Sequence, residues 1–180
     1  MITITSTSSP QLWDETTLAT DNPLYIHGDF NTINTKGVAL ISDAVNILSN
    51  ILTHKYCGIS WPQLYYYYGA STTTVNAALF AGHVPTSPDG STYSGGVHTY
   101  PRLHEDWTQR SWNPTRTLNI KGSFINLWDS EQAIAEWCIG GGCYSGPTRN
   151  WGWDVRFQDP DFWPPFIPSI FSVERVGFLE

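Results

Sequence analysis

The chain has 180 residues, enough for one domain with a substantial core. Its net charge of −7, with nine scattered Lys and Arg, argues against nucleic acid or an anionic membrane as partner. Only 14% of the residues are charged and 14% are aromatic, with 15 Gly and 12 Pro, which favours β-structure with many turns over long amphipathic helices. No apolar run reaches the roughly 18 residues of a membrane span, and the N-terminus lacks the pattern of a signal peptide.

Short β-strands are predicted along the chain, each ended by Gly, Asn, Pro or Ser clusters that turn the backbone. The candidate segments are residues 2–5, 38–48, 72–82 and 169–178. The apolar run 38–48 is also compatible with a buried helix, since short apolar runs do not separate the two.

A weak internal repeat, L-x-I-x-G-x-F, occurs at residues 24–30 and 118–124. Alternation at period two predicts that the Leu, Ile and Phe of each copy share one buried face. His27 and Lys121 then occupy matched positions, which we expect to face solvent because their side chains differ so much. The glycine of each copy suits a bend or a close backbone approach.

These features predict a mainly β fold, an irregular right-handed parallel β-helix (solenoid) with long loops rich in aromatics and Pro. Small residues such as Ala77 and Ala78 would let successive coils approach each other. A fixed period is missing, and a β-sandwich is the alternative. We expect residues 1–180 to form a single solenoid domain excised from a longer surface protein. The aromatic and Pro-rich stretch from residue 143 to 168 is expected to pack along the body of the domain.

The cluster around His27 contains oxygen ligands that could suit calcium, with Asp29 and Asn31 as the candidates. No D-x-D-x-D-G loop is present, and the same residue types turn the chain after a strand because their side chains bond nearby backbone. The turn is the preferred interpretation, and no metal or cofactor is assigned.

The densest group of ionisable residues contains His98, His104 and Glu105, which are weak candidates for acid–base catalysis. A surface turn with an ion pair to Arg102 explains the same residues without catalysis. No nucleophile elbow or phosphate loop is found. The sequence therefore leans against an enzyme.

Two cysteines, Cys138 and Cys143, flank the flexible segment IGGG. They could close a short disulfide or remain a free pair. Zinc is disfavoured, because no further Cys or His pair completes a set of ligands.

Nine Trp and nine Tyr are more than a core of this size requires. Exposed aromatic rings stack on sugars and anchor protein partners. The alternative is that the tryptophans mostly cover the core and seal its ends. The candidate binding residues are Tyr65, Tyr66, Tyr67, Trp107, Trp112, Trp151 and Trp153.

Six blocks, in this order, cover nearly the whole chain from about residue 20: TDNPLYIHGDFNT, ALISDAVNILSN, TTTVNAALFAGHVPT, YSGGVHTYPRLHEDW, LNIKGSFINLWDSEQA and PTRNWGWDVRFQDPDFWPP. Together they resemble the C-terminal domain of large bacterial surface proteins grouped with PilX-like type IV pilus assembly proteins. The resemblance implies a secreted or pilus-associated β-helix without known catalysis. The chain departs from the family pattern at His98, where an acidic residue is usual, and at His104, where an apolar one is usual.

We therefore expect a non-catalytic, extracellular or cell-surface bacterial domain with a structural or adhesive role. A carbohydrate-binding module that uses exposed aromatics is the alternative, and a β-helical polysaccharide-active enzyme is a third. The expected partner is a polysaccharide or a surface protein, and we expect this segment neither to bind nucleic acid nor to insert into a membrane.

Overall fold

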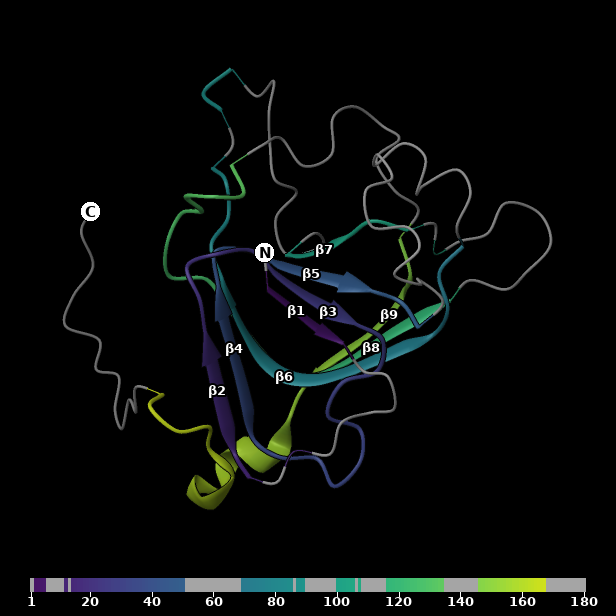
Figure 1. The fold of residues 1–180 in the computed structure, drawn as a ribbon, viewed down its shortest axis with the longest axis vertical. Coiled ribbons are helices and arrows are strands. Elements are labelled where there is room, and N and C mark those ends of the chain that lie inside the picture. Colours follow the sequence, from purple (N-terminus) through teal and green to yellow (C-terminus); the bar gives the residue numbers. More distant parts are fainter. Residues whose placement is uncertain are drawn as a thin grey trace, which may run out of the picture.

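The chain folds into a mainly β structure built from two parallel sheets (Figure 1). The computed structural model describes residues 2–5, 12, 14–50, 69–85, 87–89, 100–105, 107, 116–134 and 146–167. The predicted strand 169–178 lies outside these residues. Within the described part, no helix has the length and hydropathy that a membrane span requires.

Consecutive strands alternate between the two sheets as far as β8. Sheet A contains β1 (Ile2–Thr5), β3 (Leu24–His27), β5 (Val45–Leu48) and β7 (Pro101–Leu103), in that order. Sheet B contains β2 (Thr16–Ala19), β4 (Val38–Ser42), β6 (Thr73–Ala81), β8 (Thr117–Ile125) and β9 (Thr148–Trp153). Every pairing between the described strands is parallel. The antiparallel β-sandwich, the alternative predicted from sequence, therefore does not fit.

Alternating apolar side chains from both sheets meet in one core. In sheet A, Leu24 pairs with Val45, and Ile26 pairs with Ile47, which pairs in turn with Leu103. All five side chains are fully buried. Sheet B contributes to the same core a set of residues that comprises Val38, Leu40, Val75, Ala77, Leu79, Leu118 and Ile120. The strand period of two places these residues on the faces that the two sheets turn toward each other.

One of the two longest strands, β6, meets two successive partners along one edge. The first half of β6 lies beside Phe30, which bridges to Val75, whereas its second half pairs with β4. β9 pairs only with the first six residues of β8. Figure 1 shows that β6 is strongly curved along its length. The extra residues between Phe30 and β4 form a turn in which Asn31 and Asn34 have positive φ.

Several predictions from sequence are confirmed. Residues 2–5 and 72–82 are strands within one residue at each end, and 38–48 is strand on both sides of a break at Asp43 and Ala44. Gly28 has a φ of 80° at a bend. A Cβ on Gly122 would lie 1.7 Å from the Ala77 carbonyl oxygen, so only glycine allows β6 and β8 to pair there.

The internal repeat is only partly confirmed. Its apolar residues do face the core, but the first copy lies in sheet A and the second in sheet B. His27 and Lys121 are therefore not at equivalent positions, and the prediction of matched sites is wrong. The apolar part of the repeat recurs because each strand has the same alternation, whereas the two glycines serve different needs: Gly28 has a positive φ after β3, and Gly122 allows the close approach of β6 inside β8.

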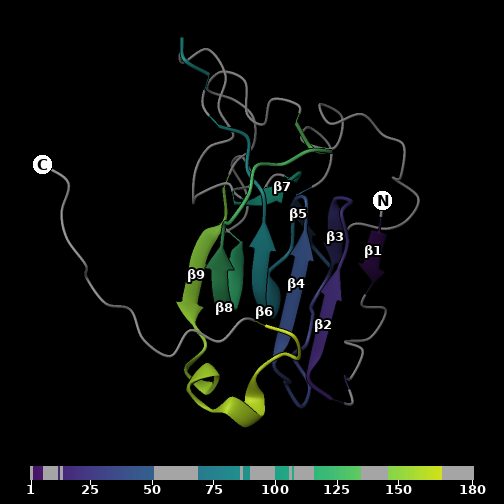
Figure 2. The same cartoon turned by 90° about the vertical axis from the view of Figure 1, so that its left-hand side faces the viewer.

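The chain leaves β9 and crosses the outside of sheet B, as expected for the aromatic and Pro-rich stretch. This segment, residues 154–167, is called the strap below. It contains two short 3-10 turns, η3 (Val155–Gln158) and η4 (Pro160–Phe162). Figure 2 shows it running from the end of β9 past the lower ends of the sheet B strands.

Candidate functional site

Sheet A carries a group of polar side chains, because three neighbouring strands turn Tyr25, Asn46 and Arg102 to its outer face. These residues are in register across β3, β5 and β7. They point outward because their neighbours along each strand fill the core. Asn46 is nevertheless only 3% exposed. Its side-chain amide donates to the Leu24 carbonyl oxygen at 3.2 Å, which fixes the direction of its Oδ1.

His104 follows β7 directly and completes this outer group. Its Nε2 lies 2.8 Å from Asn46 Oδ1. Because that oxygen only accepts, Nε2 carries the proton. The imidazole also stacks on Tyr25, with ring centroids 6.1 Å apart. Burial, and secondarily the nearby charge of Arg102, lower the pKa of His104 to about 4, so the imidazole is neutral at pH 7.

Glu105, the next residue, points the opposite way, into the core. Its side chain is fully buried. Its two oxygens accept from the Ser49 backbone N–H at 2.6 Å and the Ser49 hydroxyl at 2.5 Å. Burial raises the pKa of Glu105, against the opposing effect of the two bonds from Ser49.

Arg102 connects the outer group to the segment that follows β8. Its Nη2 donates to the Ala133 carbonyl oxygen at 2.6 Å. Asp43, which is 5% exposed, accepts from the backbone N–H groups of Glu131 and Ala133. Burial lowers the pKa of Arg102, with a partly compensating contribution from Asp43. These contacts tie the segment after β8 to the turn between β4 and β5.

This arrangement is poorly suited to acid–base chemistry. His104 and Glu105 lie on opposite sides of the backbone, so one substrate cannot meet both groups. A histidine with a pKa of about 4 is a weak base at neutral pH, and a fully buried carboxyl has no path to a reacting atom. Both side chains instead connect strands that are distant in sequence. The third predicted catalytic candidate, His98, lies outside the described residues.

The aromatic residues proposed as a binding surface have different environments. Trp107 has no exposed surface and belongs to the core, so it cannot stack on a ligand from solvent. Trp151 is half-buried, with its ring centroid 5.2 Å from that of Phe124 and the Arg149 guanidinium 5.4 Å above it. Trp153, at the end of β9, is 50% exposed. Tyr65, Tyr66, Tyr67 and Trp112 lie outside the described residues.

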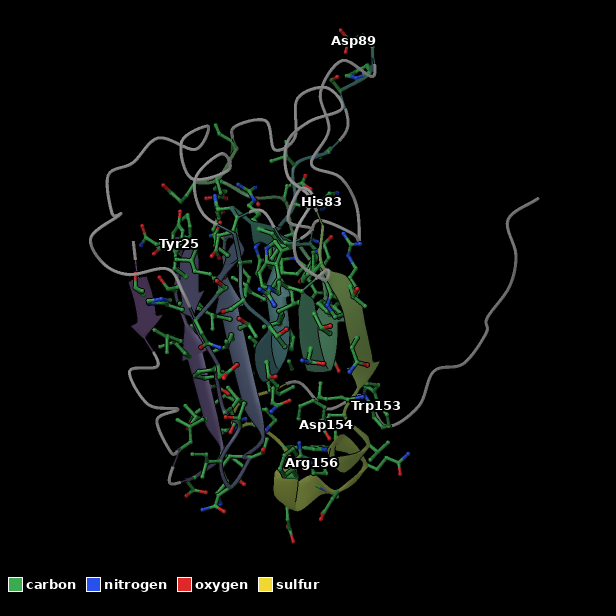
Figure 3. All side chains as sticks on the ribbon, turned by 90° about the vertical axis from the view of Figure 1, so that its right-hand side faces the viewer. Tyr25, His83, Asp89, Trp153, Asp154 and Arg156 are labelled. Carbon is green, nitrogen blue, oxygen red and sulfur yellow. The ribbon has the colours of Figure 1, made fainter. Side chains whose placement is uncertain are left out.

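Trp153 therefore remains the exposed aromatic candidate among those described. Figure 3 places it well away from Tyr25, a member of the outer group of sheet A, and near Asp154 and Arg156 at the start of the strap. Arg156 donates to Asp154 from Nε at 2.9 Å and from Nη2 at 2.6 Å. The polar outer group of sheet A and the exposed aromatic ring of Trp153 therefore lie on separate surfaces.

The candidates for calcium form a turn. Asp29 Oδ1 accepts from the Thr74 backbone N–H at 2.8 Å. The Asn31 amide donates to the carbonyl oxygens of Lys36 and Asn76, both at 2.8 Å. In the part of the chain that the structure describes, no group of three or more His, Cys, Asp or Glu could hold a metal ion. Cys138 and Cys143 lie outside that part.

Sequence reasoning missed Asn46, Ser49 and Asp43, which hold these groups in place. Asp43 and Asn46 interrupt the apolar run 38–48 and Ser49 directly follows it, and polar residues within or beside such a run are the signal that would have indicated buried hydrogen bonds. Their hydrogen-bond partners lie 56 to 90 residues further along the chain, and no local sequence pattern predicts partners at that separation. Comparison with known protein families, with characterised proteins and with solved structures found no match to this chain.

Proposed function

We propose that the chain is a right-handed parallel β-helix (solenoid) domain with a structural or adhesive, non-catalytic role outside the cell. The solenoid is supported by the alternation of strands between two parallel sheets, since each return to the first sheet adds a strand beside the previous one. A right-handed path is the usual one for parallel crossovers. The extracellular, pilus-associated setting rests on the resemblance of six ordered sequence blocks to the PilX-like surface proteins.

One observation carries the non-catalytic role: the best acid–base candidates are used as ties between strands. Glu105 connects β7 to Ser49 after β5, and His104 connects to Asn46 within β5. Such groups stabilise the stack of strands, and a stable stack of this kind presents extended surfaces to a polysaccharide or a surface protein.

A carbohydrate-binding module is the second candidate, and the exposure of Trp153 favours it. A half-exposed indole on a regular strand is a rigid surface on which a sugar ring can stack. No comparable exposure is found for Trp107 or Trp151.

The test is retention of the protein on a panel of immobilised polysaccharides, with release of reducing sugar measured in the same tubes. The structural or adhesive role predicts no release with the wild type or with Glu105→Gln. Sugar release that Glu105→Gln abolishes in a folded protein would overturn the non-catalytic role.

Retention on a particular polysaccharide, lost in Trp153→Ala, would establish the carbohydrate-binding module. Phe166→Ala is the matched control, because it also removes an exposed aromatic ring, one that is 94% exposed on the strap. If both variants are retained like the wild type, Trp153 is not the contact. If no polysaccharide retains the wild type, the partner to seek is a surface protein.

A further inference from the structure

The strap connects the last described strand of sheet B to the first. It begins where the Asp154 backbone N–H donates to the Gly122 carbonyl oxygen at 3.2 Å, beside β9 and β8. At its other end the Pro165 carbonyl oxygen accepts from Thr17 Oγ1 on β2 at 2.5 Å. These two hydrogen-bonded residues, Thr17 and Pro165, are 148 positions apart.

The strap has its own internal order. The Asp154 carboxylate accepts from the Arg156 backbone N–H and guanidinium, which starts the first 3-10 turn. Asp159 caps the second turn by accepting from the Asp161 backbone N–H at 3.0 Å. Trp163 Nε1 then donates back to the Phe157 carbonyl oxygen at 2.7 Å. The segment is thus held in one shape as it crosses the sheet.

Apolar contacts secure the strap to the middle of sheet B. Three residues on the outer face of β4 and β6, Ala39, Ala78 and Phe80, form a second small core. Phe157 and Ile167 of the strap pack against it. Because Ala39 and Ala78 are small, the strap can lie close to β4 and β6.

Gly37, just before β4, admits the strap backbone itself. A Cβ at this position would lie 1.7 Å from the Phe162 carbonyl oxygen and 2.8 Å from its carbon. Because the colliding atoms are backbone, a larger residue at position 37 must move the strap or the strand.

These contacts change how a stack of strands should unfold. In a solenoid each coil contacts only its neighbours, so the terminal coils open at lower free energy than the middle ones. Among the described strands β2 pairs only with β4, and β1 only with β3. The strap gives β2 a second set of contacts, and the hydrogen bonds and apolar contacts described above all join the strap to sheet B, whereas β1 belongs to sheet A.

We propose that the strap is a clamp that makes β2 open together with β8 and β9 instead of separately. The inference rests on the solenoid architecture proposed above. It predicts that β1 and β2, the edge strands of the two sheets, differ in the protection of their backbone amides from hydrogen exchange. The amides of β2 should be as protected as those in the middle of sheet B, and the amides of β1 should be less protected.

Hydrogen exchange of backbone amides in the full chain, followed by mass spectrometry under native conditions, tests this clamp. Thr17→Val removes the hydrogen bond to Pro165 at constant shape, and Gly37→Ala displaces Phe162. We expect β2 and β4 amides to exchange about fivefold faster in Thr17→Val, the usual effect of one hydrogen bond, with β8 unchanged. In Gly37→Ala the acceleration should reach about tenfold or more.

Two controls separate the clamp from general destabilisation. Thr16→Val is matched to Thr17→Val, because the Thr16 hydroxyl bonds only locally, to the Asp14 carbonyl oxygen at 3.0 Å. Ile47→Val weakens the shared core and should accelerate β2 and β8 in step, because the clamp makes these two strands open together.

The clamp would be overturned if amide exchange in β2 and in β8 accelerated equally in Thr17→Val. It would also be overturned if β2 amides exchanged faster than β8 amides in the wild type. Absence of protection throughout β4, β6 and β8 in the wild type would instead overturn the proposed architecture. If Gly37→Ala does not fold, the isosteric Thr17 variant still decides the question.

Discussion

Lowering the pH from 7 to 4 should destabilise the fold through His104. Folding lowers the pKa of this imidazole from 6.5 to about 4, because the ring is buried against Asn46 and Tyr25 and lies near Arg102. The neutral form is therefore favoured in the folded state, and its contribution to stability is complete above pH 6.5. It is lost as the pH falls, since the unfolded chain takes up a proton first. At about 1.4 kcal/mol per pKa unit the loss approaches about 3 kcal/mol at pH 4.

The assay is urea unfolding followed by tryptophan fluorescence, repeated from pH 7.5 to pH 4. His104→Gln keeps a donor that can reach Asn46 Oδ1 but does not titrate, so its unfolding free energy should fall less steeply with pH than that of the wild type. His83→Gln is the matched control, since His83 has a side chain that is 46% exposed. Equal pH dependence in the wild type and in His104→Gln would refute the reasoning.

Three further changes test other parts of the structure. Gly122→Ala places a Cβ 1.7 Å from the Ala77 carbonyl oxygen and should cost about 3 kcal/mol or more by urea unfolding, whereas Gly152→Ala, which meets only the end of a lysine side chain, should cost much less. Because burial raises the pKa of Glu105, its contribution is complete below the unfolded pKa and is lost as the pH rises through the folded value. The unfolding free energy of the wild type relative to that of Glu105→Gln should therefore be highest at pH 4 and should decrease toward pH 9; an increase with pH would contradict this. Phe166 has a φ of 64° and is 94% exposed, so Phe166→Gly relieves about 1–2 kcal/mol of strain against about 0.5–1 kcal/mol of added chain entropy. Its melting temperature should not fall, and a clear drop would show that the ring contributes packing.

The alternation of apolar residues was sufficient to predict much of the fold. Leu24, Ile26 and Phe30 face the core as expected, and the strands near residues 38 and 73 begin close to their predicted positions. Alternation is a local property, however, and every strand in both sheets has it. The repeat at Leu118 was therefore assigned to a position equivalent to Leu24, although the two residues lie in different sheets.

The candidate site depends on pairings that no local pattern contains. His104 meets Asn46 across 58 positions, because β7 returns to sheet A beside β5 after a long excursion. The register of that return decides that His104 faces outward and Glu105 inward. The sequence predicted a surface turn for His104 and Glu105. This prediction missed the complete burial of Glu105.

The close approach of Thr17 and Pro165 has a mechanical consequence. A pulling force between the chain before Thr17 and the chain after Pro165 would act first on the strap, sliding it along the outer face of sheet B. The ladder between β2 and β4 would carry this load only after the strap had come away. A domain pulled in this way would then have a contact that breaks first and leaves the parallel sheets intact.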